Sequence, residues 1–141
     1  MDENKLRTIC VIDGQGGGIG SVIIKKLKDR FEEKIMVVAL GTNAIATAQM
    51  LKARANKGAS GSNAIVQTVR KADVIVGPVG IIIPHAMMGE VTPVMAEAVS
   101  LSDARKILLP LSQENLEIVG TSRLPLPQMV DELLDQHLSF L

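Results

Sequence analysis

Asp13-Gly14-Gln15-Gly16-Gly17-Gly18-Ile19-Gly20 is the stretch of this sequence that decides the fold. It follows residues 8–12, an apolar and largely β-branched run that is typical of a strand buried on both faces of a parallel sheet. It opens into a helical pattern in which apolar residues recur every three or four positions, at Ile19, Val22, Ile23 and Leu27. A strand, a glycine-rich turn and a helix in this order present backbone N–H groups to a phosphate or another anion. We call residues 14–20 the glycine loop.

The rest of the chain continues the alternation of strand and helix. Buried strands are predicted at residues 35–40, 73–76 and 106–111, with helices between them. The short polar join at residues 112–115 then predicts a hairpin to a fifth strand at residues 116–119.

This alternation, with right-handed crossovers, predicts a three-layer α/β fold, Rossmann-like or flavodoxin-like, with helices on both faces of an open sheet. With the strands numbered along the chain, we expect a mostly parallel sheet of order 2-1-3-4, with strand 5 antiparallel at the edge. The order 3-2-1-4 is the alternative. A chain of 141 residues without repeats or linkers is expected to form a single domain over residues 1–141.

The expected strand order places two glycine-rich loops opposite each other. In the order 2-1-3, the loops after strands 1 and 3 meet above the carboxyl ends of the strands, where α/β proteins bind ligands. The first is the glycine loop with Asp13 before it, and the second is Gly77-Pro78-Val79-Gly80. Gly41-Thr42-Asn43 ends strand 2 beside them. These three segments are the predicted binding residues.

The sequence indicates the identity of the ligand less clearly than the position of the binding site. Gly14, Gly18 and Gly20 match the spacing of short-chain dehydrogenases, but those enzymes use a Tyr and Lys pair and this chain has no Tyr. Nicotinamide cofactors usually need an acidic residue where this chain has Gly41-Thr42-Asn43. Asn43 or Thr42 is a candidate to bond a sugar there, and the alternative is that Asn43 only caps the next helix. The loop also lacks the Lys of a P-loop. NAD(P) or another nucleotide stays open as the cofactor.

No reaction is predicted from the sequence. His85 and Glu90 are weak candidates for an acid–base pair, and a surface or backbone-bonded His85 is the alternative. The two histidines and one cysteine show no metal-ligand spacing. Asp13 has two alternative roles, to bond a ligand hydroxyl or amine, or to hold the glycine loop through its N–H groups.

Composition narrows the classes of partner. Lys+Arg and Asp+Glu balance at 15 each, and aromatic residues make up 1%, so neither a basic field nor stacking platforms favour nucleic acid. No uninterrupted apolar stretch is long enough to span a membrane, and no signal peptide is recognised, so we expect a cytoplasmic protein. Hydrophobic residues make up 47%, a surplus that favours a homo-oligomer.

Three blocks together resemble a known family. They are Val11-Ile12-Asp13-Gly14-Gln15-Gly16-Gly17-Gly18-Ile19-Gly20, Ala39-Leu40-Gly41-Thr42-Asn43-Ala44 and Val76-Gly77-Pro78-Val79-Gly80-Ile81-Ile82. They are similar to an uncharacterised bacterial family, the domain of unknown function 3842, over almost the whole chain. The resemblance implies a small Rossmann-like bacterial protein and brings no activity, substrate or catalytic residue with it.

Two interpretations follow from the sequence. In the first, the chain binds a phosphate-bearing small molecule, a nucleotide or dinucleotide, at the glycine loop. In the second, it is a non-catalytic oligomerisation or regulatory domain whose glycine loop only packs a helix on the sheet.

Overall fold

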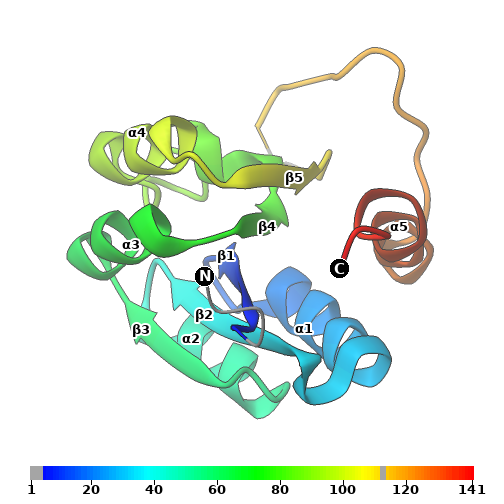
Figure 1. Cartoon of the computed structure of the whole chain (residues 1–141). Helices are drawn as coiled ribbons and strands as arrows, with labels where there is room; N and C mark the ends of the chain where they lie inside the picture. The colour runs from blue at the N-terminus through cyan, green and yellow to red at the C-terminus, as the bar shows by residue number, and fades with distance from the viewer. Residues whose placement is uncertain (1–4, 112–113) are drawn as a thin grey trace.

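The computed structural model describes residues 5–111 and 114–141 and shows an α/β fold (Figure 1). Its sheet has five strands in the order β3-β2-β1-β4-β5, and every neighbouring pair is parallel. The strands are β1 (Arg7–Asp13), β2 (Ile35–Gly41), β3 (Lys57–Ser60), β4 (Val74–Pro78) and β5 (Arg105–Leu109). The four strands predicted from apolar runs are β2, β1, β4 and β5, and they lie in the preferred order.

The helices cover both faces of this sheet, as the sequence predicts. They are α1 (Gly18–Phe31), α2 (Ala44–Lys52), α3 (Ser62–Thr68), α4 (Pro93–Leu101) and α5 (Leu126–Glu132), with short helical turns η1 (Glu32–Lys34), η2 (Val69–Lys71), η3 (Val79–Ile82) and η4 (Leu133–His137). One buried cluster joins the sheet to α1, α2 and α5, and a second joins it to α3 and α4.

β1 shows why the sequence yields two cores. Successive side chains of a strand point to opposite faces. Ile9 and Val11 therefore enter the cluster under α1, whereas Cys10 and Ile12 enter the cluster under α4. All four are fully or almost fully buried. Each buried aliphatic side chain contributes about 1.5–3 kcal/mol, so both faces of this strand stabilise the fold.

The predicted antiparallel fifth strand is wrong. Residues 116–119 form no strand and are exposed, with Val119 at 99% exposure. β5 ends at Leu109, and Pro110 has no N–H to extend a ladder. We call residues 114–125 the arm, which arches away from the body before the chain returns to α5 (Figure 1). The first half of the predicted join, residues 112–113, lies outside the described residues.

One further strand of the sheet is not predicted from the sequence. β3 pairs with β2 at the far edge of the sheet, and no strand was predicted over its residues. All four of its residues are exposed. A short edge strand with no buried face carries no apolar period, so its ladder depends on backbone hydrogen bonds that sequence patterns do not reveal.

Within the described part of the chain, no helix has the length and apolar character needed to cross a membrane.

Candidate functional site

The carboxyl ends of β1, β2 and β4 bring the three predicted binding segments to one edge of the sheet. β1 lies between β2 and β4, and the chain crosses over β1 after β3. The direction of winding changes at this point, which is the usual binding position in open α/β sheets. The glycine loop thus faces Gly41-Thr42-Asn43 on one side and Gly77-Pro78-Val79-Gly80 on the other.

Asp13 holds the glycine loop from inside. Its side chain is 4% exposed, and its two oxygens accept hydrogen bonds from the N–H groups of Gly14, at 2.8 Å, and Gly20, at 2.7 Å. Burial raises the pKa of Asp13, against the N–H groups of Gly20, Gly14 and Ile19, which favour the charged form, and the charge of Glu90 adds to the rise. Of the two roles left open by the sequence, these contacts match the second, in which Asp13 fixes the loop.

Glu90 closes the loop from outside, although it lies far away in the sequence. Its Oε1 accepts hydrogen bonds from the backbone N–H of Gln15 at 2.8 Å, the Thr42 hydroxyl at 2.7 Å and the Asn43 side-chain amide at 2.8 Å. Burial alone would raise the pKa of Glu90, but these three donors together lower it below its usual value. A charged carboxylate therefore connects the glycine loop, the end of β2 and the segment before α4.

Asn43 has one of the two roles considered for it, the helix cap, and it also bonds groups of the glycine loop and Glu90. Its side-chain oxygen caps α2 by accepting from Ala46 N–H at 2.8 Å, as predicted. Its side-chain amide donates to the Gln15 carbonyl at 3.0 Å as well as to Glu90. The end of β2 is thus tied to the glycine loop by protein groups.

Three glycines of the loop are required by packing. A Cβ on Gly14 would lie 2.5 Å from Thr42 Oγ1, and one on Gly20 would lie 2.5 Å from Met50 Sδ. Gly17 has φ of +73° and its Cβ would lie 2.8 Å from the Ala46 carbonyl. These positions leave no room for a larger side chain, so they explain part of the motif without any ligand.

A crevice of about 260 Å³ lies between the two glycine-rich loops. It is lined by Asp13, Gln15, Ile19, Pro78, Gly80, Met87, Leu111 and Glu114. This is smaller than the roughly 300–1,000 Å³ of typical small-molecule pockets. No Lys or Arg is among these described lining residues.

The second loop supplies a close-packed wall of this site. Gly77, Pro78, Val79 and Gly80 are all buried. A Cβ on Gly77 would lie 2.4 Å from the Ile12 carbonyl, so glycine lets β4 pass close to β1. Pro78 and Gly80 face the crevice.

The structure separates the two candidate catalytic residues by role. His85 is exposed, and its backbone N–H donates to the Val91 carbonyl at 2.6 Å. Within residues 5–111 and 114–141, the carboxylate of Glu90 bonds the three donors given above and does not bond His85. In the same described ranges, no group of three or more His, Cys, Asp or Glu side chains is placed to hold a metal ion.

Met87 and Glu114 are site residues that the sequence analysis did not single out. Both line the crevice, and Glu114 Oε1 accepts from the backbone N–H of Met87 at 3.1 Å. Neither belongs to a motif, and only the folded chain brings the 83–91 segment next to the residues after β5. No sequence signal marks them.

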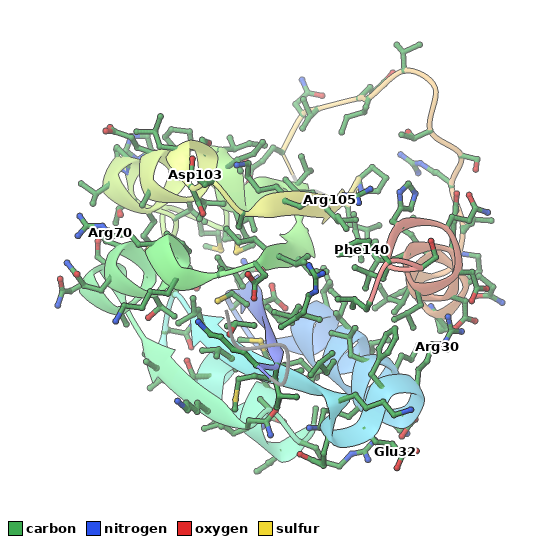
Figure 2. All side chains as sticks on the ribbon, in the orientation of Figure 1. Arg30, Glu32, Arg70, Asp103, Arg105 and Phe140 are labelled. Atoms are coloured by element: carbon green, nitrogen blue, oxygen red, sulfur yellow. The ribbon has the colours of Figure 1, made fainter. Side chains whose placement is uncertain are left out.

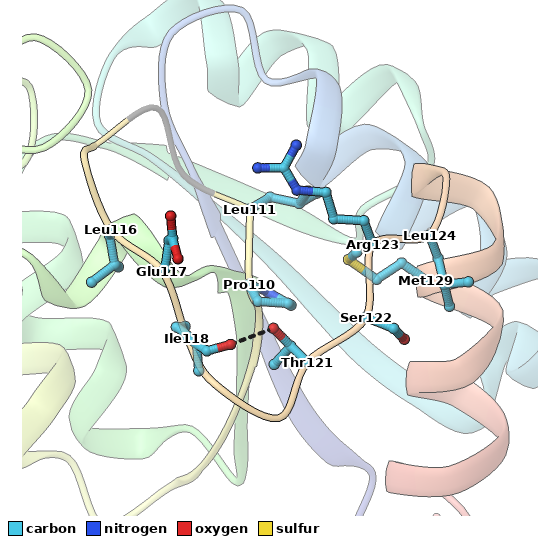
Figure 3. A pocket seen from close by; sticks show the side chains of 10 residues that line it. All are labelled: Pro110, Leu111, Leu116, Glu117, Ile118, Thr121, Ser122, Arg123, Leu124 and Met129. Carbon is cyan, nitrogen blue, oxygen red and sulfur yellow. Dashed lines mark hydrogen bonds between the residues drawn. The ribbon is translucent and has the colours of Figure 1, made fainter.

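A larger hollow of about 550 Å³ lies elsewhere, between the arm and α5 (Figure 3). Its walls include Leu116, Ile118, Thr121 and Met129, and the Thr121 hydroxyl donates to the Ile118 carbonyl at 2.7 Å. It contains none of the predicted binding residues. We therefore take the smaller crevice at the end of the sheet as the candidate site.

Comparison with known proteins adds a family to this geometry. A search of curated proteins finds no match to the chain. The model of a domain of unknown function, number 3842, matches residues 8–141, which include every predicted binding residue. The chain therefore belongs to the family defined by this domain of unknown function.

Proposed function

We propose that this chain binds a phosphate-bearing small molecule of the nucleotide class, and that the exposed N–H groups of Gly16 and Gly18 receive the phosphate. The position of the glycine loop at the end of β1 and at the start of α1 supports this assignment, because phosphates favour such helix starts.

The observation that carries the proposal is that Gly16 and Gly18 have no structural reason to be glycine. Both are exposed, neither has a positive φ, and a Cβ at either position would meet nothing within 4 Å. Glycine is also used where a ligand must approach the backbone closely. A ligand that approaches the backbone closely supplies the missing reason.

The hydrogen bonds of the loop select the same two residues. Asp13 accepts hydrogen bonds from the N–H groups of Gly14 and Gly20, and the N–H of Ile19 also stabilises its charged form. Glu90 accepts the N–H of Gln15. Gly17 N–H donates to the Gly14 carbonyl. Within the described part of the chain, this leaves the N–H groups of Gly16 and Gly18 for an external acceptor.

The charges around the crevice favour a ligand with few phosphates. Asp13 and Glu114 place two carboxyl groups in its wall, and neither Lys nor Arg is among its described lining residues. Each additional phosphate charge would be repelled there. We therefore infer a nucleoside monophosphate or a sugar phosphate in preference to a triphosphate.

Isothermal titration calorimetry with AMP, ribose 5-phosphate and adenosine tests this function. We expect heat from the two phosphorylated compounds and none from adenosine, because the loop recognises the phosphate. Equal binding of adenosine, or no heat from AMP or ribose 5-phosphate at millimolar concentration, would refute the assignment.

A second candidate function is assembly, and the arm favours it. Leu116, Ile118, Val119 and Leu124 are large apolar side chains that are all at least 36% exposed on one segment. Exposed apolar groups of this kind are often covered by another copy. Analytical ultracentrifugation of the wild type and of the Val119→Ser variant tests this assembly. A wild-type dimer that is lost in the variant supports it, and a wild-type monomer at micromolar concentration excludes it.

A further inference from the structure

The oxygen of Glu90 lies in a site that resembles an oxyanion hole. Gln15 contributes a backbone N–H, Thr42 a hydroxyl and Asn43 a side-chain amide, all within 2.8 Å of Glu90 Oε1. These donors come from the glycine loop and from the end of β2, and all are uncharged. Several neutral donors that converge on one charged oxygen form the usual arrangement for binding an oxyanion.

Nothing in this arrangement is specific to a carboxylate. A phosphate oxygen accepts the same three hydrogen bonds with similar geometry. Gln15 also directly precedes Gly16, whose N–H the proposed function assigns to the ligand. A phosphate group can therefore replace the Glu90 carboxylate at this position.

The backbone that presents Glu90 is strained. In the 83–91 turn, His85 has φ of +70°, Met87 +58°, Met88 +57° and Gly89 +90°. Residues other than glycine in this region cost on the order of 1–3 kcal/mol each. The hydrogen bonds of Glu90 thus hold a turn that its own backbone preferences oppose.

The same turn is otherwise largely self-contained. His85 N–H donates to the Val91 carbonyl, Gly89 N–H to that of His85, and Val91 N–H to that of Ala86. The exposed part of the turn, around Met88 and Gly89, can shift when an external tether is exchanged, while Ala86 and Val91 stay in the core. Glu90 provides three of its tethers to the rest of the chain.

Release of Glu90 would also change the crevice. Met87, two residues from Gly89 in the same turn, lines the crevice, and its Sδ would lie 2.6 Å from a Cβ on Gly14. The turn therefore lies directly on the glycine loop. Its movement would widen a crevice of about 260 Å³ that is small for a whole nucleotide.

We propose that Gln15, Thr42 and Asn43 form a second oxyanion subsite, that Glu90 fills it as an intramolecular competitor, and that a phosphate group of the ligand displaces Glu90. The inference rests on the proposed function, since it concerns the same ligand and the same loop. It assigns to Glu90 the control of ligand affinity and of crevice width.

Phosphate binding by Glu90 variants tests this subsite. Glu90→Gln keeps an acceptor oxygen but removes the negative charge, and Glu90→Ala removes the competitor. We expect both variants to bind inorganic phosphate about tenfold or more tightly than wild type, because an occupied site lowers apparent affinity. In ¹⁵N–¹H spectra, the Gln15 amide should shift on phosphate addition. Glu97→Gln, an exposed charge change on α4, is the matched control and should bind as wild type.

A third variant distinguishes the subsite from a general effect of charge. Thr42→Val in the Glu90→Gln background removes one donor, so it should cancel most of the gain in affinity. Urea unfolding of each variant verifies the fold, and Glu90→Gln keeps the test available should Glu90→Ala unfold. Variants that bind phosphate no more tightly than wild type would overturn the inference, as would a gain that Thr42→Val leaves unchanged.

The outcomes separate this inference from the proposed function. If AMP binds the wild type and Glu90→Gln binds phosphate no more tightly, the subsite is refuted and the proposed function stands. If AMP fails to bind the wild type but phosphate binds Glu90→Gln at Gln15, the subsite is supported and the nucleotide assignment falls. If no variant binds either compound, both are refuted.

Discussion

At the scale of single residues, Cys10 shows how burial sets chemistry. Its thiol is fully buried, and burial, with a contribution from the charge of Asp73, raises its pKa to about 12. Only the thiolate reacts with thiol reagents. We expect no reaction with Ellman's reagent in the native protein at mildly alkaline pH, and one equivalent after guanidinium unfolding. Rapid labelling of the native protein would show that the core under α4 opens more readily than the structure indicates.

Glu90 gives a prediction about pH. The folded state lowers its pKa below the usual 4.5, so its contribution to stability is present above that value and is lost as the pH falls through the lowered pKa. Glu90→Gln should therefore be less stable than wild type at neutral pH, and the difference should shrink below pH 4.5. Urea unfolding of both proteins across this range measures it. A difference that stays constant with pH would contradict the assigned contacts.

At the scale of elements, the start of α1 separates packing from binding. A Cβ on Gly20 would collide with Met50, which is fully buried, whereas a Cβ on Gly18 meets nothing. Gly20→Ala should cost about 1–3 kcal/mol in the free energy of unfolding. Gly18→Ala should leave stability within about 0.5 kcal/mol of wild type and weaken AMP binding.

The two variants form a matched pair, since each adds one methyl group to the same loop. Urea melts and calorimetry on both measure the two effects. Gly18→Ala that binds AMP as tightly as wild type would remove the role of this glycine, and equal destabilisation by both changes would show that packing explains the whole motif.

The sequence was sufficient for elements with a buried face. β1, β2, β4 and β5 all contain apolar runs, and their predicted order is correct because glycine-rich loops mark the ends of β1 and β4. β3 was missed because Lys57 and its neighbours bury nothing. The prediction of a fifth strand was wrong because no other described part of the fold covers the apolar residues at 116–119, which are exposed.

The position of the site could be predicted from the sequence, but the roles of its individual residues could not. Glycine spacing located the loop after β1, yet it did not show which glycines serve packing. That distinction depends on Met50 and Ala46, which come from α2, and on Thr42. The role of Glu90 was equally hidden, because its three donors lie 47 to 75 residues away in the chain.

At the scale of the whole molecule, the arm is the part least supported by the fold. Residues 115–125 are all exposed, whereas α5 beyond them is anchored by Met129 and Val130. Phe140 adds a contact at the C-terminus, where Arg105 lies 4.7 Å from its ring centre (Figure 2). Because the arm is exposed and α5 is anchored, we expect a protease to cut the chain first in the arm.

Limited trypsin digestion tests it. We expect the first cleavage after Arg123, which is exposed on the arm, because exposed loops without secondary structure are the preferred sites of nicking. The two fragments should remain associated in gel filtration, since α5 packs on α1 through buried side chains. Early cleavage within α1, or protection of Arg123, would contradict this description. Protection that is lost on dilution would instead indicate a covered arm.

Binding of a phosphate by the Gly16 and Gly18 amides can be followed in solution, one amide at a time. A titration of the ¹⁵N-labelled protein with AMP, followed by ¹⁵N–¹H correlation spectra, reports on each amide separately. We predict saturable shifts of the Gly16 and Gly18 amides, larger than those of Gly61 and Gly120, which lie outside the site. Unchanged Gly16 and Gly18 signals at millimolar AMP, in a protein whose spectrum remains that of the folded state, would contradict the claim.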